Sequence, residues 1–313
     1  MVTTGTYRAA VARTFGPPDV LGIVNLKVAP LAPGTIRVAV RVGGVNPVDA
    51  AIRSGSFGGS APFVPGTEFA GVVIEVAAGV RAVSVGDEVV GFGTPASDAD
   101  LVLTSPDRVV AKPADLSWQL AGAVGAVGQT ALTVLDALQP SPGAPVLVHG
   151  GSGGVGTVLV QLLVAAGVPV VATASAARAD YLRGLGATPL AYGPDLHAQL
   201  EAEYPLGFAA SIDLAGTPQA GAIGQAVREA GGAAVTIALG SARSHGIPLI
   251  QVQRSQARLA RLLADAAAGS LRMPVQTLPL AEVVEAHRRL DSGHALGKTV
   301  LDLGDNPYLP KAA

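Results

Sequence analysis

The stretch LVHGGSGGVG, residues 147–156, decides the fold of this chain. An apolar run ends there at His149, and five of the next seven residues are glycine. The segment that follows places its apolar side chains three and four positions apart, at Val155, Val158, Leu159, Leu162, Leu163 and Ala166. This pattern predicts a buried strand, a tight glycine loop and the N-terminus of an amphipathic helix over 155–166.

The glycines of this loop fit the spacing G-x-G-x-x-G at Gly151, Gly153 and Gly156. The first glycine permits a tight turn, the second lets backbone approach a pyrophosphate, and the third lets the helix pack closely. Free N–H groups and the positive end of the helix dipole also favour an anion. The alternative is a merely flexible loop, in a chain with 40 glycines among 313 residues. No lysine follows the glycines, which excludes a Walker loop. We predict a dinucleotide whose diphosphate meets the main chain of Gly151, Ser152, Gly153, Gly154 and Val155.

Strand-like and helix-like segments alternate from residue 145 onward. The strand-like segments are PVLVHG, VPVVATAS, TPLAY, FAASIDLAG and GAAVTIALG. Helical patterns lie between and after them, at 155–166, 176–186, 194–203, 217–230 and 251–268. Alternation at this pitch predicts an α/β fold with a doubly wound parallel sheet.

The chain before residue 110 consists of short β-branched runs separated by Gly, Pro and Asp, which predicts a compact, barrel-like β unit. A helix capped by Asp115 or Ser117 follows, and a second helix is expected to begin near Gly128. The tail contains a predicted helix at 281–292 and a last strand, GKTVLDL. The final residues, NPYLPKAA, are expected to be loose.

Composition excludes several classes of function. The net charge is −2 without a basic stripe, so nucleic acid is not an expected partner. Cysteine is absent, which excludes disulfides and thiolate zinc sites. The N-terminus lacks the pattern of a signal peptide, and prolines and glycines break the uncharged stretch 137–177 into pieces too short for a membrane span. We therefore expect a cytoplasmic protein without a membrane partner.

The end of the second predicted strand indicates which dinucleotide binds. NAD sites usually carry Asp or Glu there for the ribose hydroxyls. This strand continues as VVATASAARAD, with no carboxylate before Asp180 and with Ser175 and Arg178 instead. A hydroxyl and a guanidinium suit a 2′-phosphate, which favours NADP(H). The alternative makes Ser175 an N-cap and Arg178 a solvated helix residue.

These residues and the N-terminal half resemble the medium-chain dehydrogenase/reductase superfamily. The resemblance is to its zinc-independent quinone oxidoreductases, the ζ-crystallin-like branch. It extends over nearly the whole chain, through VGGVNPVDAAIRSG, PFVPGTEFAGVVIEVAAGV, VGDEVVGF, VGQTALTVL, VLVHGGSGGVGTVLVQL and ALGKTVLDL in order.

The resemblance implies a GroES-like β-barrel domain and a Rossmann domain. We assign residues 1–118 and 269–313 to the GroES-like catalytic domain and residues 119–268 to the Rossmann NADP(H)-binding domain. Zinc-dependent relatives carry a cysteine ligand where this chain reads GGVNPVD, and a His-Glu pair where it reads PGTEF. With no cysteine, and with Thr67 at the histidine position, no metal is expected, and Glu68 is interpreted as structural.

The resemblance also implies the remaining site residues. It places Asn46 and Thr130 at the nicotinamide end of the cleft, as catalytic candidates. The Asn46 amide would stabilise charge on a substrate carbonyl oxygen. A turn residue before Pro47 is the equally simple alternative. The resemblance further places Tyr192 near the adenosine phosphate and the backbone of Leu239, at the end of the fifth strand, at the nicotinamide amide.

The chain departs from the family at one position, and three hypotheses of function follow. Ala51 stands where many relatives have a tyrosine, so no tyrosine proton donor is available there, and the role of Lys298 is open.

The first hypothesis is NADPH-dependent reduction of a small quinone or α,β-unsaturated carbonyl by a homodimer. The second is an enoyl or tailoring reductase of polyketide-type secondary metabolism. The third is a non-catalytic NADPH-binding protein, since the cofactor performs the hard chemistry and leaves few catalytic side chains to recognise.

Overall fold

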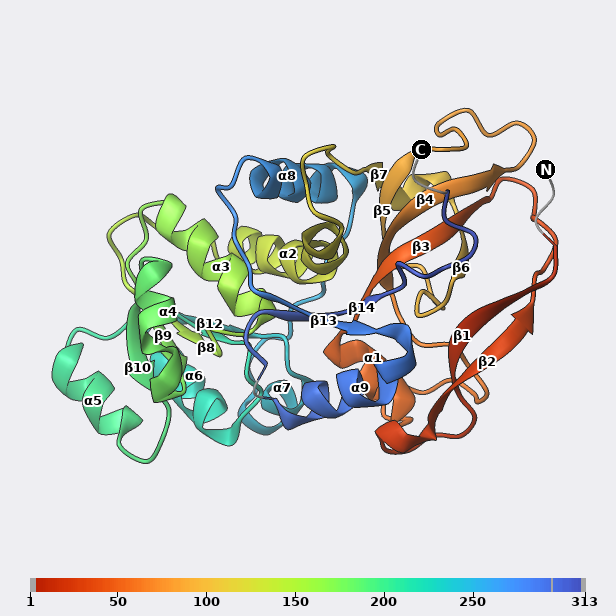
Figure 1. Cartoon of the computed structure of the whole chain (residues 1–313). Coiled ribbons are helices and arrows are strands. Elements are labelled where there is room, and N and C mark those ends of the chain that lie inside the picture. Colours follow the sequence, from red (N-terminus) through yellow and green to blue (C-terminus); the bar gives the residue numbers. More distant parts are fainter. Residues whose placement is uncertain (1–3, 294, 311–313) are drawn as a thin grey trace. The chain divides into compact units, whose positions relative to one another are not determined.

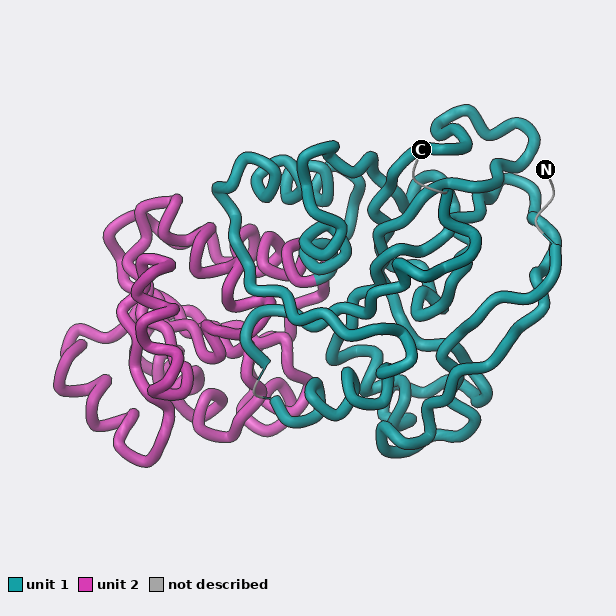
Figure 2. The backbone as a smooth tube through the Cα atoms, in the orientation of Figure 1, with its two compact units in different colours: residues 1–126, 254–313 teal, residues 127–253 magenta. Residues whose placement is uncertain are grey.

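The structure, a computed structural model, describes residues 4–293 and 295–310 (Figure 1). The chain forms two compact units (Figure 2). The first contains residues 1–126 and 254–313, and the second contains residues 127–253. Residues 119–126 and 254–268, assigned to the Rossmann domain from the sequence, therefore have their contacts mainly within the first unit.

The first unit is built on a mixed seven-stranded sheet, as the β-rich sequence predicts. Its order is β13-β14-β3-β4-β5-β7, with β6 pairing β3, and β1 and β2 form a separate antiparallel ribbon. The strands are β1 Thr6–Ala12, β2 Leu21–Lys27, β3 Ile36–Gly44, β4 Glu68–Val76, β5 Glu88–Phe92, β6 Leu101–Thr104, β7 Val109–Ala111, β13 Val275–Pro279 and β14 Lys298–Asp302. Its helices are η1 Pro18–Val20, α1 Pro47–Arg53, η2 Pro106–Arg108, α8 Gln256–Ala267, η4 Leu280–Glu282 and α9 Val283–Ser292.

Burial of β-branched and aromatic side chains holds this sheet together. Ile36, Val38 and Val40 point from β3 into one core with Phe69 of β4, all with no exposed surface. The Phe69 ring lies where a side chain at Gly91 of β5 would be, so that position requires glycine. Side chains this well buried each contribute roughly 1.5–3 kcal/mol to folding.

The second unit is a five-stranded parallel sheet in the order β10-β9-β8-β11-β12, which confirms the predicted doubly wound sheet. Its strands are β8 Val146–His149, β9 Val170–Ala174, β10 Thr188–Ala191, β11 Ala210–Asp213 and β12 Ala233–Thr236. Its helices are α3 Gly154–Ala165, η3 Ala176–Arg178, α4 Ala179–Gly184, α5 Leu196–Glu203, α6 Pro218–Glu229 and α7 Leu239–His245. The chain runs outward from β8 to β9 and β10, then returns to β11 beside β8. That reversal makes the carboxyl ends of β8 and β11 the place where a sheet of this kind binds ligands.

One helix, α2 (Trp118–Leu138), replaces the two predicted from the sequence. The Ser117 hydroxyl accepts from the Leu120 amide at 3.3 Å, as expected of a cap, but no helix begins at Gly128. A Cβ at Gly122 would lie 2.5 Å from a Val42 methyl carbon, so close packing explains a glycine inside this helix. Length and composition alone would let α2 cross a membrane, yet 72% of its apolar window is buried in the structure.

The fifth strand of the second unit is shorter than predicted. Strand β12 ends at Thr236, whose hydroxyl accepts from the Ala238 amide at 2.9 Å and turns the chain away from the sheet. Leu239 is consequently the first residue of α7 and not the end of the strand, and its side chain is 49% exposed.

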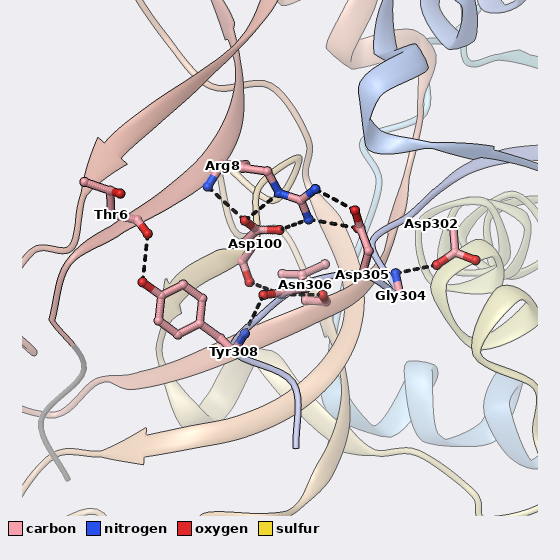
Figure 3. Close-up of polar contacts among 9 residues, drawn as sticks. Thr6, Arg8, Asp100, Asp302, Gly304, Asp305, Asn306 and Tyr308 are labelled. Carbon is pink, nitrogen blue, oxygen red and sulfur yellow. Dashed lines mark hydrogen bonds and ion pairs between the residues drawn. The ribbon is translucent and has the colours of Figure 1, made fainter. Parts of the chain in front are cut away.

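The C-terminal segment is tied down, so the prediction that it is loose is wrong for its described part (Figure 3). The buried Asn306 amide donates to the main-chain oxygens of Val40 and Asp100 at 2.8 and 2.7 Å. The Tyr308 hydroxyl donates to the Thr6 carbonyl at 2.8 Å. The tail thus connects the ribbon of β1 and β2 to the main sheet.

An arginine on β1 strengthens the same connection (Figure 3). Arg8 donates to the buried Asp100 at 2.9 Å and to the exposed Asp305 at 2.7 Å. The hydrogen bonds from Arg8 lower the pKa of Asp305. Because β1 and β2 lie outside the seven-stranded sheet, these contacts hold the ribbon against it.

We expect Asn306→Ala to lower the free energy of unfolding by about 2–3 kcal/mol, because two carbonyls lose their donors. Tyr308→Phe, which removes the exposed hydrogen bonds to the Thr6 and Thr4 carbonyls, should cost about 1 kcal/mol or less. Urea denaturation followed by the fluorescence of Trp118, the single tryptophan, reports on the first unit. Equal stabilities of the two variants would contradict the anchoring role of Asn306.

Candidate functional site

The glycine loop of the second unit has the geometry that its sequence predicts, with one shift of role. The left-handed residue of the turn is Gly150, with φ of +79°, one position earlier than Gly151. A Cβ at Gly151 would lie 2.7 Å from the Ala172 Cβ, so Gly151 allows the loop to pack on β9. A Cβ at Gly156 would overlap the Gly150 carbonyl oxygen, so Gly156 allows α3 to begin directly against the loop.

Several main-chain amides at the end of this loop have no backbone hydrogen-bond partner in the described structure. Gly151 already donates to the Thr173 carbonyl at 3.0 Å, so its predicted contact with a diphosphate is through close approach and not through its N–H. Gly154 and Val155 occupy the first turn of α3, where amides have no partner within the helix. In the part of the chain that the structure describes, the Ser152 amide likewise has no backbone partner. Unpaired amides at a helix N-terminus form an anion site.

The residues predicted to recognise a 2′-phosphate gather at the carboxyl end of β9. Ser175 occupies the N-cap position of η3, but its hydroxyl makes no capping hydrogen bond. Arg178 is partly exposed and has no ion-pair partner among the described residues. Asp180, the nearest carboxylate in sequence, is paired with Arg183 at 2.6 Å. This end of the sheet therefore offers a free hydroxyl and a free guanidinium.

Tyr192 lies beside the same group, directly after β10. Its amide donates to the carbonyl of Ala174, the last residue of β9, at 3.2 Å. The ring is 51% exposed, so it is available to cover a ligand. Ser175, Arg178 and Tyr192 thus belong to one side of the sheet, whereas Leu239 follows β12 on the other side.

In the first unit, both the nitrogen and the oxygen of the Asn46 side-chain amide make hydrogen bonds to residues of the same unit. It is the N-cap of α1, where its main-chain N–H donates to Asp49 at 2.7 Å. Its side-chain nitrogen donates to Glu68 at 3.0 Å and to the Gly44 carbonyl at 3.3 Å, and its oxygen accepts from Lys298 at 2.6 Å. Because lysine can only donate, this contact fixes which end of the amide is the oxygen.

Lys298, whose role the sequence leaves open, is the counter-ion of Glu68. Both side chains are buried, and the ammonium binds the Glu68 carboxylate directly. The other carboxylate oxygen of Glu68 accepts from the Ala126 amide of α2 at 2.6 Å. Glu68 is structural, as expected, but the sequence did not show that its partner lies 230 residues away.

Two further carboxyl groups, Asp49 and Asp98, are buried beside this ion pair. Burial raises the pKa of Asp49 to about 7. Burial, reinforced by the neighbouring Asp49, raises the pKa of Asp98 well above its usual range. Neither oxygen of Asp98 has a hydrogen-bond partner in the described structure, as expected of a group kept neutral.

The region where zinc-dependent relatives hold their metal does not fit zinc here. A lysine ammonium already binds Glu68, and a second cation beside it would be repelled. Thr67 stands at the histidine position. Among residues 4–293 and 295–310, no group of three His, Asp or Glu side chains is placed to hold a metal ion. Thr130, the other catalytic candidate, is buried on the part of α2 that belongs to the second unit.

Comparison with known proteins gives two family models along the chain. The alcohol dehydrogenase GroES-like domain model matches residues 32–157, and the zinc-binding dehydrogenase model matches residues 185–301. Together these two matches cover most of both units.

Individual relatives agree with these matches. The chain is 43% identical over 159 residues to a type I polyketide synthase of phenolphthiocerol synthesis from Mycobacterium marinum, covering 50% of this chain and 7% of that protein. It is 36% identical over 173 residues to quinone oxidoreductase from Rattus norvegicus, covering 53% of this chain and 52% of that one. The chain thus spans well under two-thirds of these relatives. A mycobacterial protein whose structure was solved in complex with NADPH is 26% identical, with a TM-score of 0.83, and the match covers 95% of this chain and 99% of that one.

The buried pair of Lys298 and Glu68 leads to a double-mutant test. Lys298→Met leaves a buried carboxylate without its cation and should cost about 3–5 kcal/mol of unfolding free energy. Adding Glu68→Gln removes that stranded charge, so the double variant should be more stable than the single one. Urea denaturation followed by Trp118 fluorescence measures the coupling. If the stability lost by the double variant equals the sum of the losses of Lys298→Met and Glu68→Gln alone, the two groups are not coupled in the folded protein.

Proposed function

We propose that this chain, which belongs to the medium-chain dehydrogenase/reductase family, is an NADPH-dependent oxidoreductase that reduces a quinone or an α,β-unsaturated carbonyl without zinc. The observation that carries the proposal is the set of unpaired amides of Ser152, Gly154 and Val155 at the start of α3. They lie at the carboxyl end of β8, where a doubly wound sheet binds a diphosphate.

The choice of NADPH over NADH rests on the end of β9. Arg178 and Ser175 are free to bind a 2′-phosphate, because neither is used within the fold. Asp180, which would repel that phosphate, is already neutralised by Arg183. The NADPH complex of the mycobacterial relative supports the same choice.

Bound NADPH would supply the hydride that reduces an electron-poor carbon. Negative charge then develops on the substrate oxygen, and the Asn46 side-chain nitrogen is the donor that we assign to it. That nitrogen would exchange its longer hydrogen bond, 3.3 Å to the Gly44 carbonyl, for the substrate while keeping the one to Glu68. Thr130 is assigned to the nicotinamide ribose or the substrate. The homodimer and the cytoplasmic location stay predictions.

The polyketide synthase relatives favour a second candidate, an enoyl or tailoring reductase with the same hydride chemistry. NADPH oxidation measured with simple quinones, with small enones and with thioester enoyl substrates distinguishes the two candidates. Turnover of quinones supports the first candidate, and turnover of enoyl thioesters alone supports the second. NADPH binding without oxidation of any of them would leave a non-catalytic binding protein.

We expect Arg178→Asp to weaken NADPH binding by a factor of about 10–100, because a charge-assisted hydrogen bond to phosphate is replaced by repulsion. NADH, which lacks the 2′-phosphate, should bind within about twofold of its original affinity. Calorimetric titration with both nucleotides measures the difference. Arg228→Asp is the matched control, since Arg228 lies in the last turn of α6 and donates to the Gly246 carbonyl at 2.7 Å, and it should leave the preference unchanged. Equal losses of affinity for NADPH and NADH in the Arg178 variant would contradict the assignment of Arg178 to the 2′-phosphate.

A further inference from the structure

Four polar side chains stand in register across the carboxyl edge of the parallel sheet. Thr173 of β9, His149 of β8, Asp213 of β11 and Thr236 of β12 are paired along neighbouring strands. Each is at most 3% exposed. Buried polar groups cost free energy unless hydrogen bonds satisfy them, so this polar row has to be explained.

Asp213 is the member of the polar row with the most partners. One of its carboxylate oxygens accepts from the amides of Ala215 and Gly216 at 2.9 and 2.8 Å. The other accepts from the Thr236 hydroxyl at 3.0 Å. Both carboxylate oxygens of Asp213 are therefore hydrogen-bonded, one to the main chain of the loop after β11 and the other to Thr236 of β12. Several donors together stabilise the carboxylate.

Through Thr236 the contact extends to the loop after β12. The Thr236 hydroxyl accepts from the Ala238 amide at 2.9 Å, immediately before Leu239. Gly216 has φ of +67°, and a Cβ there would lie 2.8 Å from the Ala238 Cβ. The loops after β11 and β12 are thus packed on each other, and Asp213 sets the shape of both.

The other two residues of the polar row, Thr173 and His149, lie next to the loop after β8. The Gly150 amide donates to the Thr173 hydroxyl at 3.3 Å and to the Thr173 carbonyl at 3.2 Å. His149 Nε2 is buried and has no partner in the described part of the chain, and burial lowers the pKa of His149 to about 4. Because His149 is neutral, the Asp213 carboxylate is stabilised by the two amides and the hydroxyl that donate to it and not by a charged histidine.

We propose that Asp213 is a positioning residue for the nicotinamide half of the dinucleotide, an inference that rests on the proposed function. The dinucleotide crosses the sheet at the reversal of strand order between β8 and β11. Its adenosine half then lies toward β9 and β10, where Ser175 and Arg178 are. Its nicotinamide half lies toward β11 and β12, and among the described residues the Asp213 side chain makes its hydrogen bonds to groups on those two strands and their loops.

A purely structural role for Asp213 predicts a different result. A weakened fold would reduce affinity for every part of the cofactor. A positioning role affects one half only. The fragment 2′,5′-ADP, which contains the adenosine half with its 2′-phosphate and no nicotinamide, separates the two roles within one protein.

The test is calorimetric titration of the wild type and of Asp213→Ala with NADPH and with 2′,5′-ADP. We expect the variant to bind NADPH at least about tenfold more weakly and to bind 2′,5′-ADP within about twofold of the wild type. Asp213→Asn should restore NADPH binding to within about threefold, because its amide oxygen still accepts from Ala215 and Gly216. Thr173→Val, in the other half of the polar row, is the matched control and should not reproduce this split.

Thr236→Val decides the matter if Asp213→Ala does not fold, since it removes the hydroxyl that joins the Asp213 carboxylate to the Ala238 amide and should weaken binding of NADPH but not of 2′,5′-ADP. Equal losses for both ligands, or no loss for either, would overturn the positioning role. A wild-type protein that binds neither ligand would instead overturn the proposed function, and the inference with it.

Discussion

The close approach of Gly156 to the Gly150 carbonyl is the constraint on which the rest of the second unit depends. No side chain fits between the loop and the first turn of α3, so α3 begins at Gly154, after a loop of only four residues that follows His149. The unpaired amides of that turn therefore lie at the reversal of strand order, where the two halves of the sheet meet. A larger residue at this position would move the helix start away from β8 and with it the anion site.

Buried charges follow one rule in both units, which is that each has identifiable partners or is kept neutral. Glu68 is matched by Lys298 and by an amide of α2, and Asp213 is matched by two amides and a hydroxyl. Asp98 has no such partners, and burial raises its pKa well above the usual range, which favours its neutral form. The lysine at Glu68 also explains why a chain related to zinc-binding dehydrogenases has no place for the metal. The cation beside Glu68 is the ammonium group of Lys298, the first residue of β14.

The sequence predicted those features that depend on local periodicity. The alternation after residue 145, the glycine loop and the helix after it are confirmed, because each element is encoded by residues close together in sequence. The predicted one-sided apolar face of that helix is not, since Thr157 and Val160 are buried as well. The errors lie where distant contacts override the local pattern. Asn306, for example, binds a carbonyl 266 residues away. The early end of β12 is instead a local effect, because the Thr236 hydroxyl accepts from the Ala238 amide two residues later. Lys298 escaped assignment because its partners Asn46 and Glu68 lie more than 200 residues away in sequence.

The amides between β8 and α3 are the centre of this account, and their ligand can be measured directly. Isothermal titration of the purified chain with NADPH should show one saturable site per chain and competition by free pyrophosphate-containing nucleotides. Absence of heat with NADPH, NADP⁺, NADH and NAD⁺ alike would contradict it, because the loop would then be shaped for packing alone.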